Sequence, residues 1–208
     1  MDYPPRHYLS VNKELLVATA EAYPLAALSS IWGEKHAITH LPLVYYPDDG
    51  VEQEHFIGHF DARNPQVESI GQSMTAVFTG PSLYISPNDY EKQKGRLPTY
   101  NFIRLHLTGQ TERINDEARV MQSLVELTEY LERTDTQWEL ATDNMVAQKL
   151  LPYIVAFRFI PTSWTGRFKL SQDKSVHERQ RTFDKLKSMH REPTPGYWHL
   201  LRQELFEQ

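Results

Sequence analysis

Apolar and polar residues alternate along short stretches in the first half of the chain, which is the pattern of half-buried β-strands. In Asn101–Gln110, one side of the predicted strand carries Ile103, Leu105 and Leu107. The other side carries Phe102, Arg104, His106 and Thr108. One face of this strand is therefore apolar, and the other can hold a ligand or a partner. Similar β-rich patterns predict strands at Leu25–Trp32, His36–Tyr46, His55–Ala62 and Ile154–Ile160.

The stretch Ala76–Pro87 is predicted to be the bent central strand of a small barrel. Its apolar run stops at Gly80-Pro81, resumes at Leu83 and stops again at Ser86-Pro87. A glycine inside a strand often marks a bend, and a proline cannot donate a hydrogen bond to the neighbouring strand. We therefore expect a strand that bends at Gly80 and ends at Ser86.

Two of the predicted strands, His36–Tyr46 and His55–Ala62, are separated by a turn signal, so we expect them to pair as a hairpin. Each strand carries two histidines four residues apart, which on a strand lie about 13 Å apart, too far to share a metal ion. Only a cross-strand pair such as His40 and His59 can converge. Because the chain offers no cysteine and no obvious third ligand, we predict no metal site, and histidines that make hydrogen bonds or line a ligand.

Apolar residues at helical spacing predict several helices. Asn12 is a suitable N-cap for a helix that runs to Tyr23, and Asn115 or Asp116 can cap a second helix. The second helix carries its apolar residues at Val120, Met121, Leu124, Val125, Leu127 and Leu131. Further helices are expected at Met145–Leu151 and between Val176 and Met189.

The length of 208 residues suits one domain, residues 1–208. We expect a mainly β fold with accessory α-helices, in which a barrel covers about residues 25–172 and contains inserted helices. A C-terminal helical arm is expected to follow over about residues 173–208. The aromatic-rich end of this arm, Tyr197–Phe206, is expected to pack against its own domain or against a second subunit.

Composition narrows the class of protein. The net charge is −5 and the sequence pI is near 6.0, so the chain lacks the basic field that drives non-specific nucleic-acid binding. The absence of cysteine excludes disulfides, thiolate metal sites and a cysteine nucleophile, and it fits a reducing compartment. The opening residues do not form a signal peptide, and no apolar run is long enough to cross a bilayer. We therefore expect a cytoplasmic protein. No dinucleotide fingerprint or phosphate loop is present, which argues against a Rossmann domain.

The segment Thr165–Gln172 places Arg167, Lys169, Ser171 and Gln172 close together beside a glycine. Cationic side chains with hydroxyl and amide donors suit a phosphate group. The same composition is common in ordinary surface loops, so the sequence leaves both interpretations open.

Several motifs occur in order along nearly the whole chain. They are His40-Leu41-Pro42-Leu43, Gly58-His59 with Asn64-Pro65-Gln66, Phe78-Thr79-Gly80-Pro81, Tyr84-Ile85-Ser86-Pro87, Pro98-Thr99-Tyr100-Asn101-Phe102 with His106, and Gly166–Gln172. In these motifs the chain resembles the PaiB family of FMN-binding proteins, which are usually described as negative transcriptional regulators. The resemblance implies the FMN-binding split-barrel fold, with FMN as the cofactor and a homodimer that holds the flavin in a groove at the subunit interface.

Carried onto the matching positions, the resemblance implies a set of cofactor-binding residues. They are Thr39, His40 and Leu41 on one strand, Gly58, His59 and Asn64 on and after the next, then Tyr84, Ser86, Tyr100 and Asn101, and finally Lys169, Ser171 and Gln172. Cations and hydroxyls are expected at the phosphate, and aromatic rings and backbone amides near the isoalloxazine, because protein donors tune a cofactor that carries its own chemistry.

The chain departs from the family pattern at a few positions. Relatives usually have an arginine where this chain has Ala62, and the arginine here is Arg63, which on a strand would point to the opposite face. The usual tryptophans are replaced by Tyr100 and Asp89. A tyrosine can keep a stacking contact and an aspartate cannot, so we expect weaker flavin binding or an altered substrate pocket.

Three classes of function remain open at this point. The first is an FMN-binding homodimer in a redox role, which includes an FMN-dependent oxidoreductase. The second is a transcriptional regulator that acts through DNA or a protein partner, although neither the charge nor a DNA-binding motif supports direct DNA contact. The third is a split-barrel dimer that has lost flavin and binds another small ligand. No nucleophile–base pair or carboxylate dyad indicates a reaction, so the catalytic residues are unknown.

Overall fold

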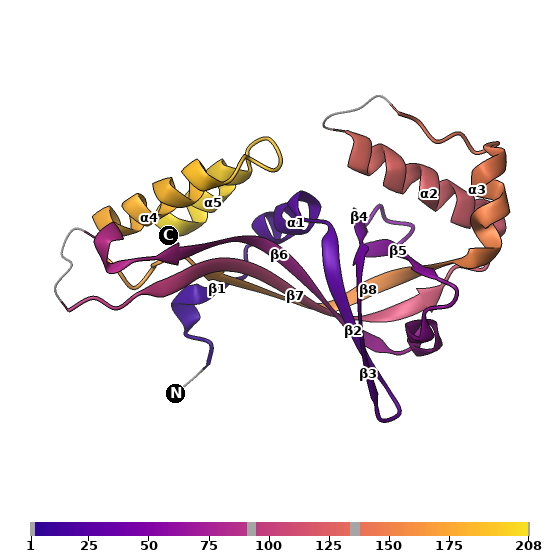
Figure 1. The fold of residues 1–208 in the computed structure, drawn as a ribbon, viewed down its shortest axis with the longest axis horizontal. Coiled ribbons are helices and arrows are strands. Elements are labelled where there is room, and N and C mark those ends of the chain that lie inside the picture. The colour runs from indigo at the N-terminus through magenta and orange to yellow at the C-terminus, as the bar shows by residue number, and fades with distance from the viewer. Residues whose placement is uncertain (1–2, 91–94, 134–137, 208) are drawn as a thin grey trace. The chain divides into compact units, whose positions relative to one another are not determined.

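The computed structural model describes residues 3–90, 95–133 and 138–207. The chain forms two compact units, each built from segments that lie far apart in the sequence (Figure 1). Unit 1 comprises Met1–Tyr23, Val77–Leu107 and Trp164–Gln208. Unit 2 comprises Pro24–Ala76 and Thr108–Ser163. Each unit is described below by itself.

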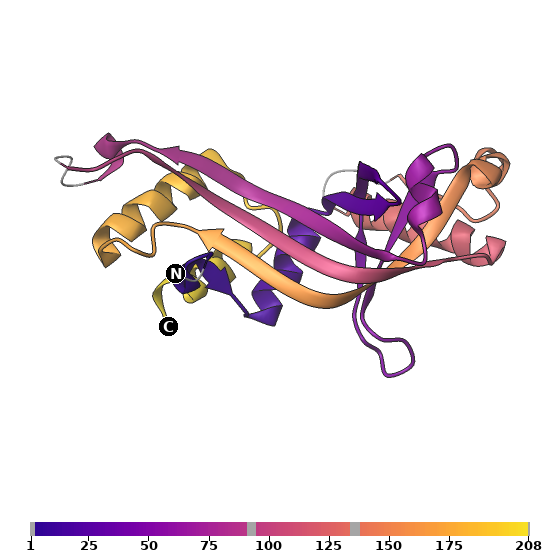
Figure 2. The ribbon, with the colours of Figure 1, turned by 90° about the horizontal axis from the view of Figure 1, so that it is seen from below.

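The strands of the described residues belong to one sheet of eight strands, whose order is β3-β2-β6-β7-β8-β5-β4, with β1 paired to β8 (Figure 2). Their bounds are β1 Leu9–Ser10, β2 Leu25–Trp32, β3 Lys35–Pro42, β4 Val44–Tyr46, β5 His55–Asp61, β6 Ser73–Ile85, β7 Thr99–Arg113 and β8 Ile154–Lys169. The pairs β1–β8, β2–β3, β4–β5 and β5–β8 are antiparallel. The predicted mainly β fold is confirmed. The expected barrel does not close, because β3 and β4 are the two ends of the sheet.

The hairpin predicted between His36–Tyr46 and His55–Ala62 is only partly correct. The first of these segments is two strands: β3 pairs with β2, and only β4 pairs with β5. Pro42 ends β3, because a proline has no N–H to continue the ladder. The tight turn at Gly33, whose φ is 59°, joins β2 to β3, so β3 finds its partner among its immediate neighbours.

The strand β6 passes through Gly80-Pro81 as one continuous strand, as predicted, and the predicted end at Ser86 is confirmed. In unit 1, a Cβ at Gly80 would lie 3.0 Å from Cγ2 of Ile103 on β7. Gly80 therefore allows the neighbouring strand to pack closely, and its role is not to break the strand.

The strand β8 is longer than the predicted Ile154–Ile160, since it continues to Lys169. The pairing of Leu9 with Arg167 and of Ser10 with Gly166 extends it. Most of Thr165–Gln172 is therefore strand rather than loop, and only the residues after Lys169 form a turn.

The helices largely follow the predicted pattern. The α-helices are α1 Lys13–Ala22, α2 Glu117–Glu132, α3 Met145–Leu150, α4 Val176–Met189 and α5 Tyr197–Phe206, and the short 3₁₀ helices are η1 Arg6–Tyr8, η2 Pro65–Ser69, η3 Pro87–Asp89 and η4 Leu151–Tyr153. Asn12 caps α1 by accepting from the backbone N–H of Leu15, and Asp116 caps α2 by accepting from that of Ala118. Both predicted caps are confirmed.

In unit 1 the C-terminal helices bury their aromatic residues within the unit. Tyr197 and Trp198 of α5 are buried, and the Tyr197 hydroxyl lies 3.2 Å from Oγ1 of Thr19 on α1. Phe183 of α4 contacts Trp198 edge to face, and Figure 1 shows the two helices side by side. Of the two predicted packing partners, the arm therefore contacts its own unit.

In unit 2 the helix α2 packs its apolar side on the sheet. Val120, Met121 and Val125 form one buried cluster with Ala156 of β8 and Leu151 of η4. Among residues 3–90, 95–133 and 138–207, no helix is both long enough and apolar enough to cross a membrane.

Candidate functional site

The sequence-predicted site residues fall into two groups, one in each unit. Thr39, His40, Leu41, Gly58, His59 and Asn64 lie in unit 2, and Tyr84, Ser86, Tyr100, Asn101, Lys169, Ser171 and Gln172 lie in unit 1. The two groups are therefore treated separately, starting with unit 2.

Asn64 connects the end of β5 to β3 in unit 2. Its Nδ2 donates to Oγ1 of Thr39 at 2.8 Å, and its Oδ1 accepts from the backbone N–H of Gln66 at 2.9 Å, which caps η2. Both polar ends of this side chain are thus occupied within the unit. His40 lies on the exposed side of β3, next to the half-buried Thr39.

Gly58 has a packing role. A Cβ at this position would lie 2.7 Å from Leu43, 2.9 Å from Leu41 and 3.0 Å from Phe157, all of them buried side chains. Leu41, predicted as a flavin contact, is 4 % exposed and belongs to this core. These two positions therefore shape the interior of unit 2.

His59 is held in one tautomer by a hydrogen bond in the interior of unit 2. Its Nε2 lies 2.8 Å from Oγ of Ser123, and that hydroxyl donates its proton to the carbonyl of Val120 at 2.7 Å. Nε2 therefore carries the imidazole proton and donates to Ser123. Nδ1 is buried and has no partner among the described residues. Burial, and then the positive charge of Arg119, lower the pKa of His59 to about 4, so the ring is neutral at pH 7 and supplies no charge to a phosphate.

Arg63, the displaced arginine of the family pattern, is neutralised by a carboxylate. It donates from Nε to Oδ1 of Asp61 at 3.0 Å and from Nη2 to Oδ2 at 2.7 Å. These bonds lower the pKa of Asp61 to about 2. The pair is a fork-to-fork contact, in which two donors of Arg63 are used and the carboxylate offsets its positive charge.

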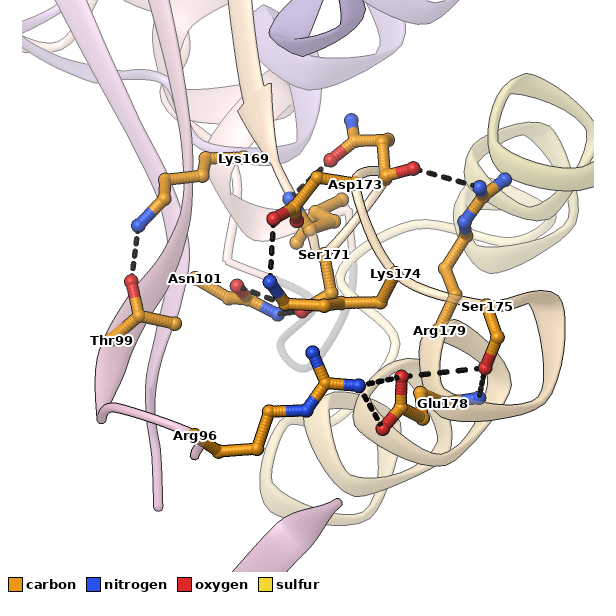
Figure 3. Close-up of polar contacts among 12 residues, drawn as sticks. Arg96, Thr99, Asn101, Lys169, Ser171, Asp173, Lys174, Ser175, Glu178 and Arg179 are labelled. Atoms are coloured by element: carbon orange, nitrogen blue, oxygen red, sulfur yellow. Dashed lines mark hydrogen bonds and ion pairs between the residues drawn. The ribbon is translucent and has the colours of Figure 1, made fainter. Parts of the chain in front are cut away.

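In unit 1, Asn101 of β7 contacts the turn that follows β8, which contains the predicted residues Ser171 and Gln172 (Figure 3). Asn101 Nδ2 donates to Oγ of Ser171 at 3.0 Å, and both residues are buried. Gln172 accepts from the backbone N–H of Leu170 at 2.7 Å and donates to the carbonyl of Phe168. Ser171 adopts a φ of 67°, which is uncommon for a residue with a side chain. These contacts fasten β7 to the end of β8.

We expect Asn101→Ala to lower the free energy of unfolding by about 1–3 kcal/mol, because it leaves the buried hydroxyl of Ser171 without its partner. Urea unfolding measures this change. Asn88→Ala is the matched control, since Asn88 is exposed. If Asn101→Ala kept the wild-type stability but lost flavin, Asn101 would act in the cofactor site and not in the turn.

Lys169 lines a small polar cavity of about 170 Å³ in unit 1. Its ammonium donates to Oγ1 of Thr99 and to the carbonyl of Tyr100 at 2.9 Å, while Lys174 is paired with Asp173 at 2.6 Å. The other lining residues are Tyr8, Tyr90, Leu97, Asn101 and Ser171. Ligand pockets that enclose a whole organic molecule measure roughly 300–1,000 Å³. This cavity can take an anionic group or water, and it is too small for a flavin ring system.

Ser86 and Asp89 form a capping box at η3 in unit 1. The Ser86 side chain accepts from the backbone N–H of Asn88 at 3.3 Å, and Asp89 accepts from that of Ser86 at 2.7 Å. Asp89 also pairs with Lys185 of α4 at 2.7 Å. The aspartate that replaces a family tryptophan is therefore a structural residue in this chain.

Tyr84 and Tyr100 form an aromatic pair on the open side of β6 and β7. Their ring centroids lie 5.7 Å apart at an interplanar angle of 64°, and the two residues are 47 % and 60 % exposed. Exposed aromatic surface of this kind commonly marks a binding site. Of the predicted residues in unit 1, these two offer ring faces to a ligand.

Three basic residues of unit 1 were not among the predicted site residues. Arg104 and His106 lie on the same side of β7, and Arg167 lies on β8. The alternating pattern of β7 was the signal that could have identified the first two, because their neighbours Ile103, Leu105 and Leu107 are fully buried. Arg167 was considered only as part of a loop.

Comparison with known protein families assigns the chain to one of them. The sequence model of a family described as "Putative FMN-binding domain" matches residues 2–162. No curated protein matches the chain.

Solved structures share the fold at low sequence identity. The flavocytochrome Anf3 from Azotobacter vinelandii is 15 % identical with a TM-score of 0.56, over 77 % of this chain and 69 % of that one. The FAD and heme binding protein from Mycobacterium smegmatis is 13 % identical with a TM-score of 0.59, over 83 % and 78 %. A protein from Bacteroides thetaiotaomicron described as a putative 5-nitroimidazole antibiotic resistance protein is 9 % identical with a TM-score of 0.55, over 76 % and 84 %. At these identities the likeness is one of fold.

Proposed function

Because the chain belongs to the FMN-binding domain family and FMN is thus its cofactor, we propose that it is a flavoprotein of the PaiB type that acts as a homodimer. In this proposal the flavin lies where two copies of the chain meet, and it serves a redox or regulatory role. The observation that carries the proposal is the family match, which extends over residues 2–162 of 208.

The side chains of unit 1 fit a flavin. The exposed rings of Tyr84 and Tyr100 offer flat apolar surface to an isoalloxazine, and rings of this kind pack in stacked or edge-to-face geometry. Lys169 places an ammonium beside Tyr100, whose carbonyl it contacts. FMN, when bound, supplies the transfer of electrons, while the protein side chains bind it, orient it and exclude water.

The edge of unit 2 supports association with a second copy. Ile31 and Ile38 are 57 % and 65 % exposed, and they lie on the paired strands β2 and β3, of which β3 ends the sheet. Apolar side chains beside an unpaired strand edge are typical of a protein–protein contact. Sedimentation of Ile38→Glu against wild type tests this contact, and a wild-type protein that is monomeric with flavin bound contradicts the dimer.

The proposal predicts a flavin spectrum from the purified protein. We expect visible absorption bands of flavin that move into the supernatant after heat denaturation, or that develop when FMN is added to colourless protein. A chain that stays colourless after incubation with FMN contradicts the proposed function. Reduction of the bound flavin by NADH or NADPH would favour the redox role, and a mobility shift of DNA with a steep salt dependence would favour the regulatory role.

We expect Tyr100→Ala to weaken FMN binding by roughly 2- to 10-fold, because an aromatic contact contributes about 0.5–1.5 kcal/mol beyond its buried area. Quenching of flavin fluorescence on titration with the protein measures the dissociation constant. Tyr153→Ala is the matched control, since Tyr153 is also 60 % exposed but lies in unit 2 on η4. Equal losses in both variants would show that Tyr100 has no specific contact with the flavin.

A further inference from the structure

Arg104, His106 and Arg167 form a basic patch on the open face of unit 1. Residues 104 and 106 alternate on β7 with the fully buried Ile103, Leu105 and Leu107, so both side chains point away from the core. β7 and β8 are neighbours in the sheet, and Lys169 of β8 contacts Thr99 and Tyr100 of β7. Arg167, two residues before Lys169 on β8, therefore lies beside the stretch of β7 that leads to Arg104 and His106. The basic patch thus contains side chains from two strands, β7 and β8.

The two guanidinium groups of the basic patch have no carboxylate partner among the described residues. Arg104 donates to the backbone carbonyls of Gly80 at 3.0 Å and Ile103 at 2.6 Å, and Arg167 donates to the Tyr3 hydroxyl at 3.0 Å. They also lie over aromatic rings, Arg104 at 5.7 Å from Phe102 and Arg167 at 5.2 Å from Tyr3. Their positive charge is therefore not offset by an acidic side chain in this part of the structure.

Four other arginines of the described chain are paired with carboxylates. Arg63, Arg96, Arg119 and Arg158 pair with Asp61, Glu178, Glu126 and Glu52, at 2.6–2.9 Å. Two basic residues of the family motifs are also unavailable to a phosphate, since Arg63 is paired and His59 is neutral. A charged ligand thus meets more uncompensated positive charge at the basic patch than at these pairs.

The chemistry of the basic patch suits a phosphate monoester. Burial, and then the charges of Arg167 and Arg104, lower the pKa of His106, so its imidazole is a neutral hydrogen-bonding group at pH 7. Guanidinium groups bind phosphate oxygens through pairs of N–H donors. Lys169 lies two residues beyond Arg167 on β8 and therefore on the same face of the strand, which adds a further cation.

We propose that Arg104 and Arg167, with His106 beside them, bind the phosphate of FMN, and this inference rests on the proposed function. FMN carries a phosphate monoester and riboflavin does not, so the two ligands differ only in the group assigned to the basic patch. The exposed Tyr84–Tyr100 pair belongs to the same unit, and in this proposal it contacts the isoalloxazine ring of the flavin. The basic patch accordingly sets the preference for FMN over riboflavin.

The test is a fluorescence titration of flavin-free protein with FMN and with riboflavin. We expect wild type to bind FMN at least tenfold more tightly than riboflavin, because charged hydrogen bonds contribute about 1.5–3 kcal/mol each. Arg104→Gln and Arg167→Gln should each weaken FMN binding by roughly 10- to 100-fold and leave riboflavin binding within about twofold. Arg181→Gln is the matched control, since it removes the same charge from an exposed position on α4 of the same unit.

Inorganic phosphate provides a second readout. It should compete with FMN in wild type and compete more weakly in Arg167→Gln. Because Arg104 contacts two backbone carbonyls and its replacement can disturb β6 and β7, Arg167→Gln decides the matter if Arg104→Gln does not fold.

Several outcomes would overturn the inference. They are equal affinity of wild type for FMN and riboflavin, equal loss of both ligands in the variants, and a loss in Arg181→Gln as large as in Arg167→Gln. A wild-type protein that binds neither flavin contradicts the proposed function itself, and this result is distinct from each of the others.

Discussion

Acidification from pH 6.5 to pH 4 is expected to remove about 3 kcal/mol of stability through one residue, His59. Its pKa is lowered from 6.5 to about 4 in the folded protein, chiefly by burial and then by Arg119. Between these two pH values the unfolded chain binds a proton that the folded chain does not, so the free energy of unfolding falls as the pH falls. The stabilising contribution is complete above pH 6.5 and is lost on the way down to pH 4.

The structural cause is the environment of the second ring nitrogen. Nε2 of His59 donates to Ser123, and protonation would place an N–H at Nδ1, which is buried without a partner among the described residues. The positive charge would also face Arg119. Desolvation and like charge therefore act in the same direction.

Urea unfolding of His59→Gln at several pH values isolates this contribution. A glutamine amide can donate to Ser123 but does not titrate, so the difference in stability between wild type and variant should shrink by about 3 kcal/mol between pH 6.5 and pH 4. His40→Gln is the matched control, because His40 is exposed on β3, and its stability should follow the wild type. A constant difference between wild type and His59→Gln over this range would contradict the buried neutral state.

Features of the fold that depend on neighbouring residues could be predicted from the sequence. The bounds of β2, Leu25–Trp32, were predicted correctly because alternation and the flanking Pro24 and Gly33 define them locally. The caps of α1 and α2 were also correct, since a cap is a contact between residues two or three apart. Residues close in the sequence were sufficient to predict this strand and these two caps.

Strand pairing could not be predicted in the same way, because it depends on contacts between distant segments. The segment His36–Tyr46 has one continuous β-rich pattern, yet Pro42 divides it between two partners. The far end of β8 is strand because β1 pairs with it, and nothing in Thr165–Gln172 itself indicates that partner. Only the tertiary structure decides between these alternatives.

The partners of the predicted site residues could not be predicted for the same reason. The sequence identifies Asn101, Ser171 and Gln172 as polar residues but does not identify their partners. In the structure, Asn101 and Ser171 form a hydrogen bond with each other, and Gln172 forms one with the backbone. Conversely, Arg104 was visible on the polar side of β7, yet the absence of a carboxylate partner can be recognised only in three dimensions. What separates a binding residue from a structural one is its neighbours.

Gly109→Ala is expected to destabilise unit 2 by roughly 3 kcal/mol or more, because the added methyl group has no space. A Cβ at Gly109 on β7 would lie 2.5 Å from the carbonyl oxygen of Ile160, 2.9 Å from its carbonyl carbon and 2.8 Å from Cζ of Phe159. Two of these atoms are backbone of the neighbouring strand β8, so relief requires the strands to separate. A flexible side chain could turn aside, but a paired backbone cannot do so without losing hydrogen bonds.

Gly80→Ala is the matched comparison, since its Cβ would lie 3.0 Å from Cγ2 and 3.1 Å from Cβ of Ile103, a milder overlap that a small local adjustment of β7 relieves. Urea unfolding and the yield of folded protein should therefore rank wild type first, Gly80→Ala second and Gly109→Ala last. Equal stability of the two variants would show that β7 and β8 can separate locally at little cost. Because β7 also carries Arg104 and His106, a loss of FMN binding in Gly109→Ala that exceeds the loss in Gly80→Ala would indicate that the basic patch needs an intact pairing of these two strands.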